Sequence, residues 1–334
     1  MHVLLRSVRT DDEGVASTLG TTMALLVFLT FMSLIVNQYV PAWMRESEAS
    51  HVNTVLGQFG GLKEAIDLQI LAAHSAANAG HAYIPVTATT AVSLGVDGIP
   101  IFAASTPATL TAIGSNAAFS VTFDYAVRGT RQRVVQISNG SIEINVENRY
   151  FTPQRIAYEN GAIIRYQSDG QIIRGPPTFS VRNINNALDM TFGLVSLFGV
   201  GTVTGTSTEV INSQLFAVDA QEYTAFPSDS RIWVNHTSPY GLAWYQFLNE
   251  TLASSLWSPG WTGTFIQTSL DVSFTAQYLG KTVYIVSARY DPTTSQYTTR
   301  LEIRNNVGVL SFGTFRLLIA NVNVQVGVAT VRGP

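Results

Sequence analysis

Cysteine is absent from this chain of 334 residues, and lysine occurs only at Lys63 and Lys281. A chain without cysteine has no disulfide framework, no thiol nucleophile and no cysteine-ligated metal site. The absence leaves the cellular compartment open, because an exported protein can also do without thiols.

Charge is also scarce. Asp, Glu, Lys and Arg make up 12% of the residues, against about 25% in ordinary soluble domains, and the net charge is −3. No basic block is present, and nucleic-acid binding requires clustered cations, so we expect no nucleic-acid partner. With 46% hydrophobic residues the chain is long enough to bury a core in one or two domains.

The longest uncharged segment lies near the N-terminus. No Asp, Glu, Lys or Arg occurs from Val15 to Met44. A helix over that segment would be about 45 Å long, more than the roughly 30 Å of a bilayer core. Tyr39 and Trp43 lie at its end, where aromatic rings favour the membrane interface. We therefore predict a membrane-spanning helix over residues 15–40, the alternative being a buried core helix.

The residues around the start of this helix resemble a known signal. The sequence Asp11-Asp-Glu-Gly-Val-Ala-Ser-Thr-Leu-Gly20, followed by the apolar segment, resembles the class III signal peptide of archaeal type IV pilin-like proteins. The resemblance implies that residues 1–14 are removed by a prepilin peptidase, which cuts between Gly14 and Val15. Leu19 stands at the fifth mature position, where many bacterial pilins have Glu, so the resemblance is to the archaeal proteins.

A second helical pattern follows over residues 45–75. Its apolar residues recur at spacings of three and four, which predicts one buried stripe on an amphipathic helix: Val52, Val55, Leu56, Phe59, Leu62, Ile66, Leu68 or Gln69, and Ile70. Pro41 and the pair Gly60-Gly61 are predicted bends. The helix of residues 15–77 is either a pilin stalk or an anchor followed by a helix that covers its own domain.

From about residue 78 to 334 the pattern has the period of β-strands, which predicts an α+β protein with a long N-terminal helix and a β-rich, sandwich-like, mostly antiparallel head. Asn139-Gly140 and Asn160-Gly161 predict two hairpins. Further strands are expected at 119–127, 188–198, 270–276, 283–288, 297–304 and 316–328, with one helix at 240–252. Residues 199–208 are either a boundary between two subdomains or a surface strand. We expect the strands beyond Asn78 to close their own core.

Motifs for catalysis or metal binding are missing from the sequence. The five histidines have no metal-ligand spacing, the acidic residues of the head are scattered, and no P-loop, dinucleotide fingerprint or nucleophile elbow occurs. We predict no enzyme activity, no cofactor and no metal. The cluster of Trp233, Trp244, Trp257 and Trp261 is interpreted as core, although exposed rings could stack on sugars or another surface.

Three asparagines lie in glycosylation sequons, Asn139, Asn235 and Asn249, of which Asn139 is expected at an accessible hairpin tip. The resemblance implies a structural subunit of a surface filament at the cell membrane or extracellular surface. Its partners would be the membrane, the prepilin peptidase and further copies or related pilin subunits. Leu25, Phe28 and Leu29 are the expected helix-assembly residues. The alternatives are a monomeric, membrane-anchored binding protein and an exported hydrolase with the same anchor.

Overall fold

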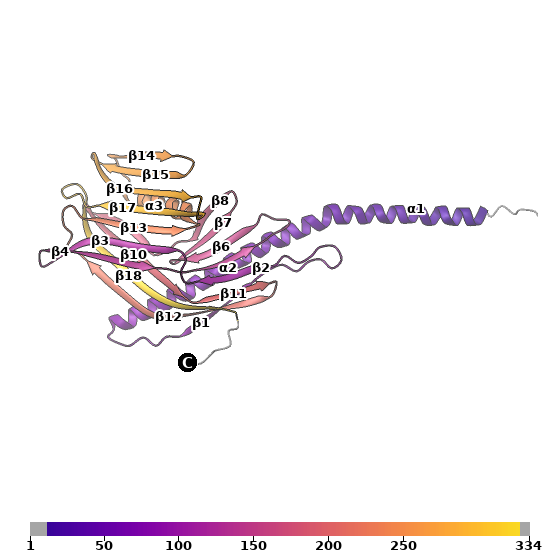
Figure 1. The fold of residues 1–334 in the computed structure, drawn as a ribbon, viewed down its shortest axis with the longest axis horizontal. Coiled ribbons are helices and arrows are strands. Elements are labelled where there is room, and N and C mark those ends of the chain that lie inside the picture. Colours follow the sequence, from indigo (N-terminus) through magenta and orange to yellow (C-terminus); the bar gives the residue numbers. More distant parts are fainter. Residues whose placement is uncertain (1–11, 328–334) are drawn as a thin grey trace, which may run out of the picture.

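The computed structural model describes residues 12–327, with side chains from Ser17 onward. Its first part is one long helix, made of α1 (Asp12–Leu34), the π-helical turn η1 (Ile35–Tyr39) and α2 (Val40–Asn78). Pro41 has no N–H to donate. The N–H of the preceding residue, Val40, donates to the Ile35 carbonyl five residues back, as in a π-helix. The helix changes direction near this turn (Figure 1). The predicted bend at Gly60-Gly61 does not interrupt α2.

Three β-sheets follow. The five-stranded sheet has the order β1 (Thr87–Ser93), β12 (Thr208–Tyr223), β18 (Ser311–Val326), β10 (Ala187–Phe198) and β9 (Phe179–Ile184). The six-stranded sheet has the order β11 (Val200–Gly205), β2 (Ala108–Ile113), β5 (Ser141–Val146), β6 (Gln154–Glu159), β7 (Ala162–Gln167) and β8 (Gly170–Gly175). Residues 200–205 therefore form an edge strand.

The seven-stranded sheet has the order β14 (Trp261–Gln267), β15 (Asp271–Tyr278), β16 (Lys281–Asp291), β17 (Gln296–Arg304), β13 (Arg231–Ser238), β3 (Ala118–Val127) and β4 (Thr130–Ser138). Helix α3 (Gly241–Leu256) packs against β16 and β17. Pairing between strands is antiparallel throughout the described residues except for the parallel pair β10 and β18. The expected α+β architecture is confirmed.

Two large hydrophobic cores fill the body, and strands β10 and β18 contribute to both. A small third cluster, formed by Val40, Met44 and Val96, lies where the helix meets the body. The first core lies between α3, the seven-stranded sheet and the first halves of these two strands. The second core contains the α2 stripe, including Phe59, Leu62 and Ile66, which lies against β1, β12, β6 and β7. Residues of β2, β5 and the second halves of β10 and β18 complete this core. Elements beyond Asn78 supply all of the first core, as expected. The second core departs from the expectation, because α2 supplies one wall of it.

Hydrogen bonding determines that Gln69, and not Leu68, belongs to the buried stripe of α2. Leu68 is 57% exposed, whereas Gln69 is buried. The Gln69 amide donates to the Ser213 carbonyl at 3.3 Å and accepts from the Leu215 N–H at 2.6 Å. The register between β12 and β18 shifts directly after Leu215. A glutamine in the buried stripe thus pairs with backbone groups of β12 beside a bulge, which a leucine could not do.

Of the two predicted hairpins, one is confirmed and one is wrong. Asn160 and Gly161 have φ angles of 45° and 78° and join β6 to β7 in a tight turn. Asn139-Gly140 instead carries the chain from β4 in one sheet to β5 in another. A Cβ on Gly140 would lie 2.4 Å from the Leu197 carbonyl oxygen, so glycine is required there by the close approach of β10.

Candidate functional site

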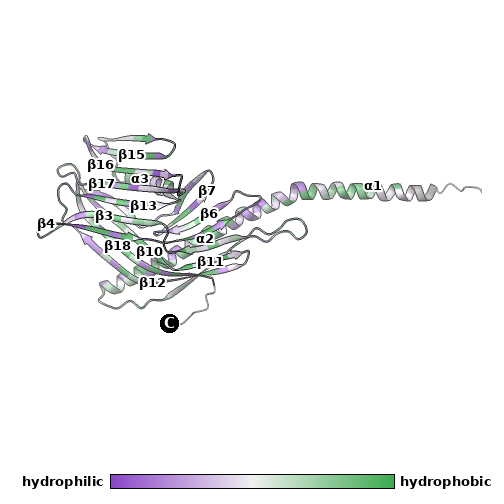
Figure 2. Cartoon of the chain, viewed as in Figure 1, coloured by the Kyte–Doolittle hydropathy of each residue, from purple (hydrophilic) through white to green (hydrophobic). Residues whose placement is uncertain are grey.

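The first candidate site is the exposed surface of the N-terminal helix. Over residues 17–34 the side chains are exposed apart from a half-buried Met32, and Leu25, Phe28 and Leu29 are 56%, 53% and 52% exposed. Figure 2 shows this helix as an apolar rod projecting from the body. It is the one helix in the described chain that is long and apolar enough to cross a membrane. An apolar surface of this size requires a covering partner.

Polar side chains of this helix hydrogen-bond within it. Thr22 and Thr30 donate their hydroxyls to carbonyls one turn back, each at 2.7 Å, and the Asn37 amide donates to the Ser33 carbonyl at 2.8 Å. These bonds lie within the helix, so the polar atoms need no hydrogen-bond partner from another molecule. The outer surface of the rod is therefore compatible with lipid or with other apolar helices.

A buried carboxylate fixes the helix to the body. Glu48 is fully buried, accepts a hydrogen bond from the Thr106 hydroxyl at 2.7 Å, and accepts from the backbone N–H groups of Arg149, Tyr150 and Phe151 at 2.7–3.1 Å. Charge-assisted bonds of this kind are strong because both oxygens are satisfied away from water. They join α2 to two loops of the body, so the projecting helix and the body form one unit.

His51, one turn beyond Glu48, also faces the body. Its Nε2 atom lies 3.0 Å from the Ser93 carbonyl oxygen, and its Nδ1 atom is buried without a partner among the described residues. Burial lowers the pKa of the His51 imidazole below its ordinary value, against the opposing effects of the Ser93 bond and the Glu48 charge.

This lowered pKa predicts acid sensitivity. The unfolded chain takes up a proton at His51 more readily than the folded chain does. The contribution of the buried, neutral imidazole to the stability of the fold is therefore fully present above about pH 6.5 and is lost as the pH falls through the lower folded pKa. We expect His51→Gln to reduce the loss of thermal stability on acidification from pH 7 to 5, measured by circular dichroism. An unchanged pH profile would contradict the assignment.

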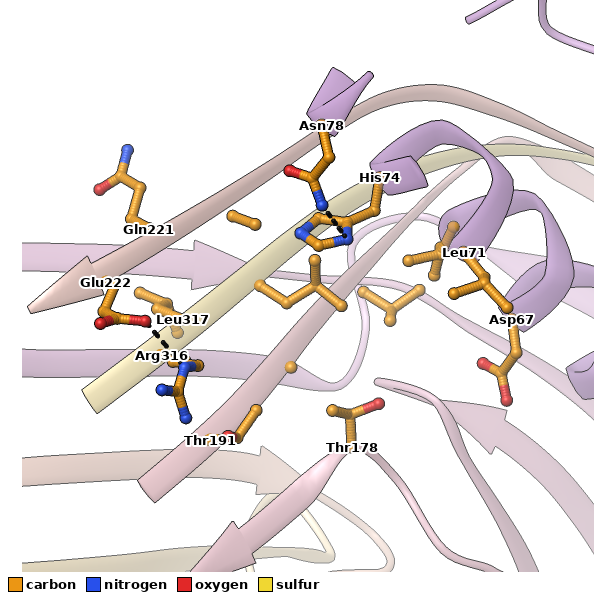
Figure 3. Close-up of a pocket in the computed structure, with 15 residues that line it drawn as sticks. Asp67, Leu71, His74, Asn78, Thr178, Thr191, Gln221, Glu222, Arg316 and Leu317 are labelled. Carbon is orange, nitrogen blue, oxygen red and sulfur yellow. Dashed lines mark hydrogen bonds and ion pairs between the residues drawn. The ribbon is translucent and has the colours of Figure 1, made fainter. Parts of the chain in front are cut away.

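The second candidate site is a groove of about 580 Å³ between the end of α2 and the five-stranded sheet (Figure 3). Its floor is apolar, formed by the buried residues Ile70, Val195 and Leu317. Polar side chains surround the floor. The Asn78 amide lies 3.3 Å from His74 Nδ1, and Arg316 forms a 2.8 Å ion pair with Glu222. An apolar floor with a polar rim is the usual composition of a ligand-binding groove.

A polar cluster that could be mistaken for a catalytic site lies inside the body. The Glu159 carboxylate accepts bonds from His236 Nε2 at 3.0 Å, from the Ser238 hydroxyl at 3.1 Å and from the Trp244 indole. These groups are at most 1% exposed, and the serine bonds to the glutamate and not to the histidine. The arrangement therefore lacks both access and the geometry of a nucleophile with its base. It joins β6, β13 and α3.

A second carboxylate, Glu143, lies near this cluster and accepts a bond from the Tyr240 hydroxyl at 3.1 Å. Burial raises the pKa of Glu143, and the neighbouring Glu159 charge raises it further. Glu143 and Glu159 are scattered in the sequence, as expected, and the fold brings them close enough to interact electrostatically. The two residues lie on neighbouring strands, β5 and β6, and their proximity depends on strand pairing.

The remaining candidate residues are dispersed. Asn139 is exposed, but it lies in the connection between two sheets and not at a hairpin tip, whereas Asn235 and Asn249 are half-buried. Trp244 and Trp261 are core residues as expected, while Trp257 is 42% exposed. Gly14 and Val15 fall within the α1 backbone, and their side chains lie outside the described residues, as do residues 1–11.

Among residues 12–327 no group of three or more His, Asp or Glu side chains is arranged to hold a metal ion. No family model matches the chain, and no curated protein or solved structure shows significant similarity to it.

Proposed function

We propose that this chain is a structural subunit of an archaeal type IV pilus-like surface filament, which is inserted in the membrane and assembles through residues 15–40. The observation that supports this proposal is the continuity of the helix. Its front half is apolar and exposed around its whole circumference, while its rear half is built into the second core of the body.

A helix that continues from the rod into the body would fix the orientation of the body in a filament. When the apolar rod leaves the bilayer, it must be covered by the rods of other copies, and burial contributes about 25 cal/mol for each Å² of apolar surface. Leu25, Phe28 and Leu29 would then pack against neighbouring copies. A body attached through Glu48 and the α2 stripe keeps one orientation relative to the rod, as a regular helical array requires.

Proteolytic processing tests this proposal. A prepilin peptidase would cut between Gly14 and Val15 and leave the apolar rod at the start of the mature chain. We expect the intact mass of the native protein to correspond to a chain that begins at Val15, and Gly14→Leu to block the cleavage. A native chain that begins at Met1, or near residue 45, would contradict the pilin-like function.

A second candidate function is that of a surface binding protein anchored singly by the same helix. The groove beside α2 favours it, because an apolar floor with His74, Asn78 and Arg316 on its rim is suited to an amphipathic ligand. This function requires the helix to contact only lipid. The two functions therefore differ in whether the chain forms filaments.

A further inference from the structure

Strand β14 is an open edge of the seven-stranded sheet. It pairs with β15 on one side and has no partner strand on the other within residues 12–327. Every residue from Thr262 to Gln267 is exposed, including Phe265 at 57% and Ile266 at 58%. Edge strands are normally protected by charge, proline or a covering element. The sequence of β14, Trp-Thr-Gly-Thr-Phe-Ile-Gln, has neither charge nor proline.

The backbone of β14 has free hydrogen-bonding groups at known positions. The Thr268 N–H donates to the Asp271 carbonyl at 2.8 Å and thus faces β15. Backbone groups alternate in direction along a strand, so Thr264 and Ile266 also face β15. The N–H and C=O groups of Gly263, Phe265 and Gln267 therefore point outward. Another extended strand can pair with all of these groups at once, because its own backbone groups have the same spacing.

We propose that β14 is a homophilic docking edge, which pairs antiparallel with β14 of a second copy about Thr264. In this register Phe265 lies opposite Gly263 of the partner strand, and Ile266 lies opposite Thr262. The outward-facing residues Gly263 and Phe265 would exchange hydrogen bonds across the junction, and Thr264 would face its own symmetry mate.

The side chains of β14 fit this register. A Cβ on Gly263 would lie 2.5 Å from the Phe274 ring and 2.9 Å from the Trp257 ring, so both rings lean over this glycine. The Phe265 ring of the second copy would meet this aromatic surface, and Trp257 would lose its exposure to water. Aromatic pairs across strands are among the favourable cross-strand contacts.

The absence of charge on β14 also favours pairing with a second copy of the chain. Symmetric pairing brings the side chains of β14 close to those of the same strand in the second copy. Because β14 has no charged residue, no like charges meet across the junction. Asp271, the acidic residue nearest to β14 in the sequence, is accompanied by Arg289 at 3.6 Å. The opposite edge strand, β4, carries Arg131 and Arg133 and is less suited to self-pairing.

The symmetry of the β14 pairing determines how the two chains are oriented relative to each other. Antiparallel partners in one sheet are related by a half-turn about an axis perpendicular to that sheet. Helix α1 extends along the direction of the strands of the seven-stranded sheet (Figure 1). The half-turn therefore points the two α1 helices in opposite directions. Such a contact links chains on opposing membranes, or in filaments of opposite direction, and it does not depend on filament formation.

Cysteine cross-linking tests the register, since the chain has no cysteine of its own. The full chain carrying Thr264→Cys is placed, with two different tags, in two populations of phosphatidylcholine vesicles, which are mixed under mild oxidation. Thr264 meets its symmetry mate as a non-hydrogen-bonded pair about 4.5 Å apart at Cα, within the range for a disulfide. Thr262→Cys is the matched control, because its symmetry mate would be roughly 13 Å away.

We expect disulfide dimers containing both tags from Thr264→Cys and at most about a tenth as many from Thr262→Cys. Equal yields from the two variants, no dimers, or dimers only between chains in one vesicle would overturn the proposal. In the cysteine-free chain, Phe265→Lys is expected to reduce vesicle aggregation at least about tenfold, whereas Val135→Lys on β4 leaves it unchanged. Loss of aggregation with Val135→Lys would indicate pairing of β14 with β4 instead.

Discussion

Replacing Phe59 by alanine is expected to lower the free energy of unfolding of the body by about 3–5 kcal/mol. Phe59 is fully buried at the centre of the α2 stripe, and the second core combines residues of the helix with residues of strands from two sheets. The loss combines the transfer of the ring to water with the cavity that remains.

The measurement is urea unfolding of the full chain in detergent, followed by tryptophan fluorescence. Leu68→Ala is the matched control, because Leu68 lies on the same helix but is 57% exposed, and a surface substitution changes stability by only about 0.5 kcal/mol. If both variants were equally stable, α2 would not be part of the body's core.

The second large effect concerns assembly. Phe28→Leu is expected to leave membrane insertion and folding of the body unchanged but to reduce the yield of filaments strongly. Lipid accepts one apolar side chain in place of another, because hydrocarbon does not discriminate shape. A packed helical core does discriminate, and lost ring volume costs on the order of 1 kcal/mol for each subunit, repeated along the polymer.

Membrane insertion is measured by carbonate extraction and filament yield by shearing cells and weighing the pelleted material. Phe216→Leu is the control, since Phe216 is 79% exposed on β12 of the body and lies outside the helix. Filaments that form with equal yield from wild type, Phe28→Leu and Phe216→Leu would contradict packing of Phe28 in the filament core, and a wild type without filaments would favour a singly anchored protein.

Local patterns predicted the parts of the fold that local chemistry determines. The uncharged segment before Met44 predicted the projecting rod, and spacings of three and four predicted the buried positions Val52, Val55 and Phe59. Asn160-Gly161 predicted its hairpin because both residues adopt positive φ there. In each case the determining residues are neighbours in the sequence.

Features that depend on residues far away in the sequence could not be predicted from local patterns. Asn139-Gly140 has the composition of a hairpin turn, but its glycine is required by the approach of Leu197. Nothing near Glu48 in the sequence indicates its burial, because the three N–H groups that bind its carboxylate come from a loop about a hundred residues later. The open edge at β14 follows from strand order, which the alternation of side chains does not reveal.

The central claim is that the apolar rod assembles with copies of itself, and electron microscopy tests it most directly. Material sheared from the surface of cells that express the chain is negatively stained, and the same fraction is analysed by mass spectrometry. We expect filaments whose major or minor component is this chain, beginning at Val15. A surface fraction that contains the processed chain but no filaments would contradict the claim and leave a singly anchored protein.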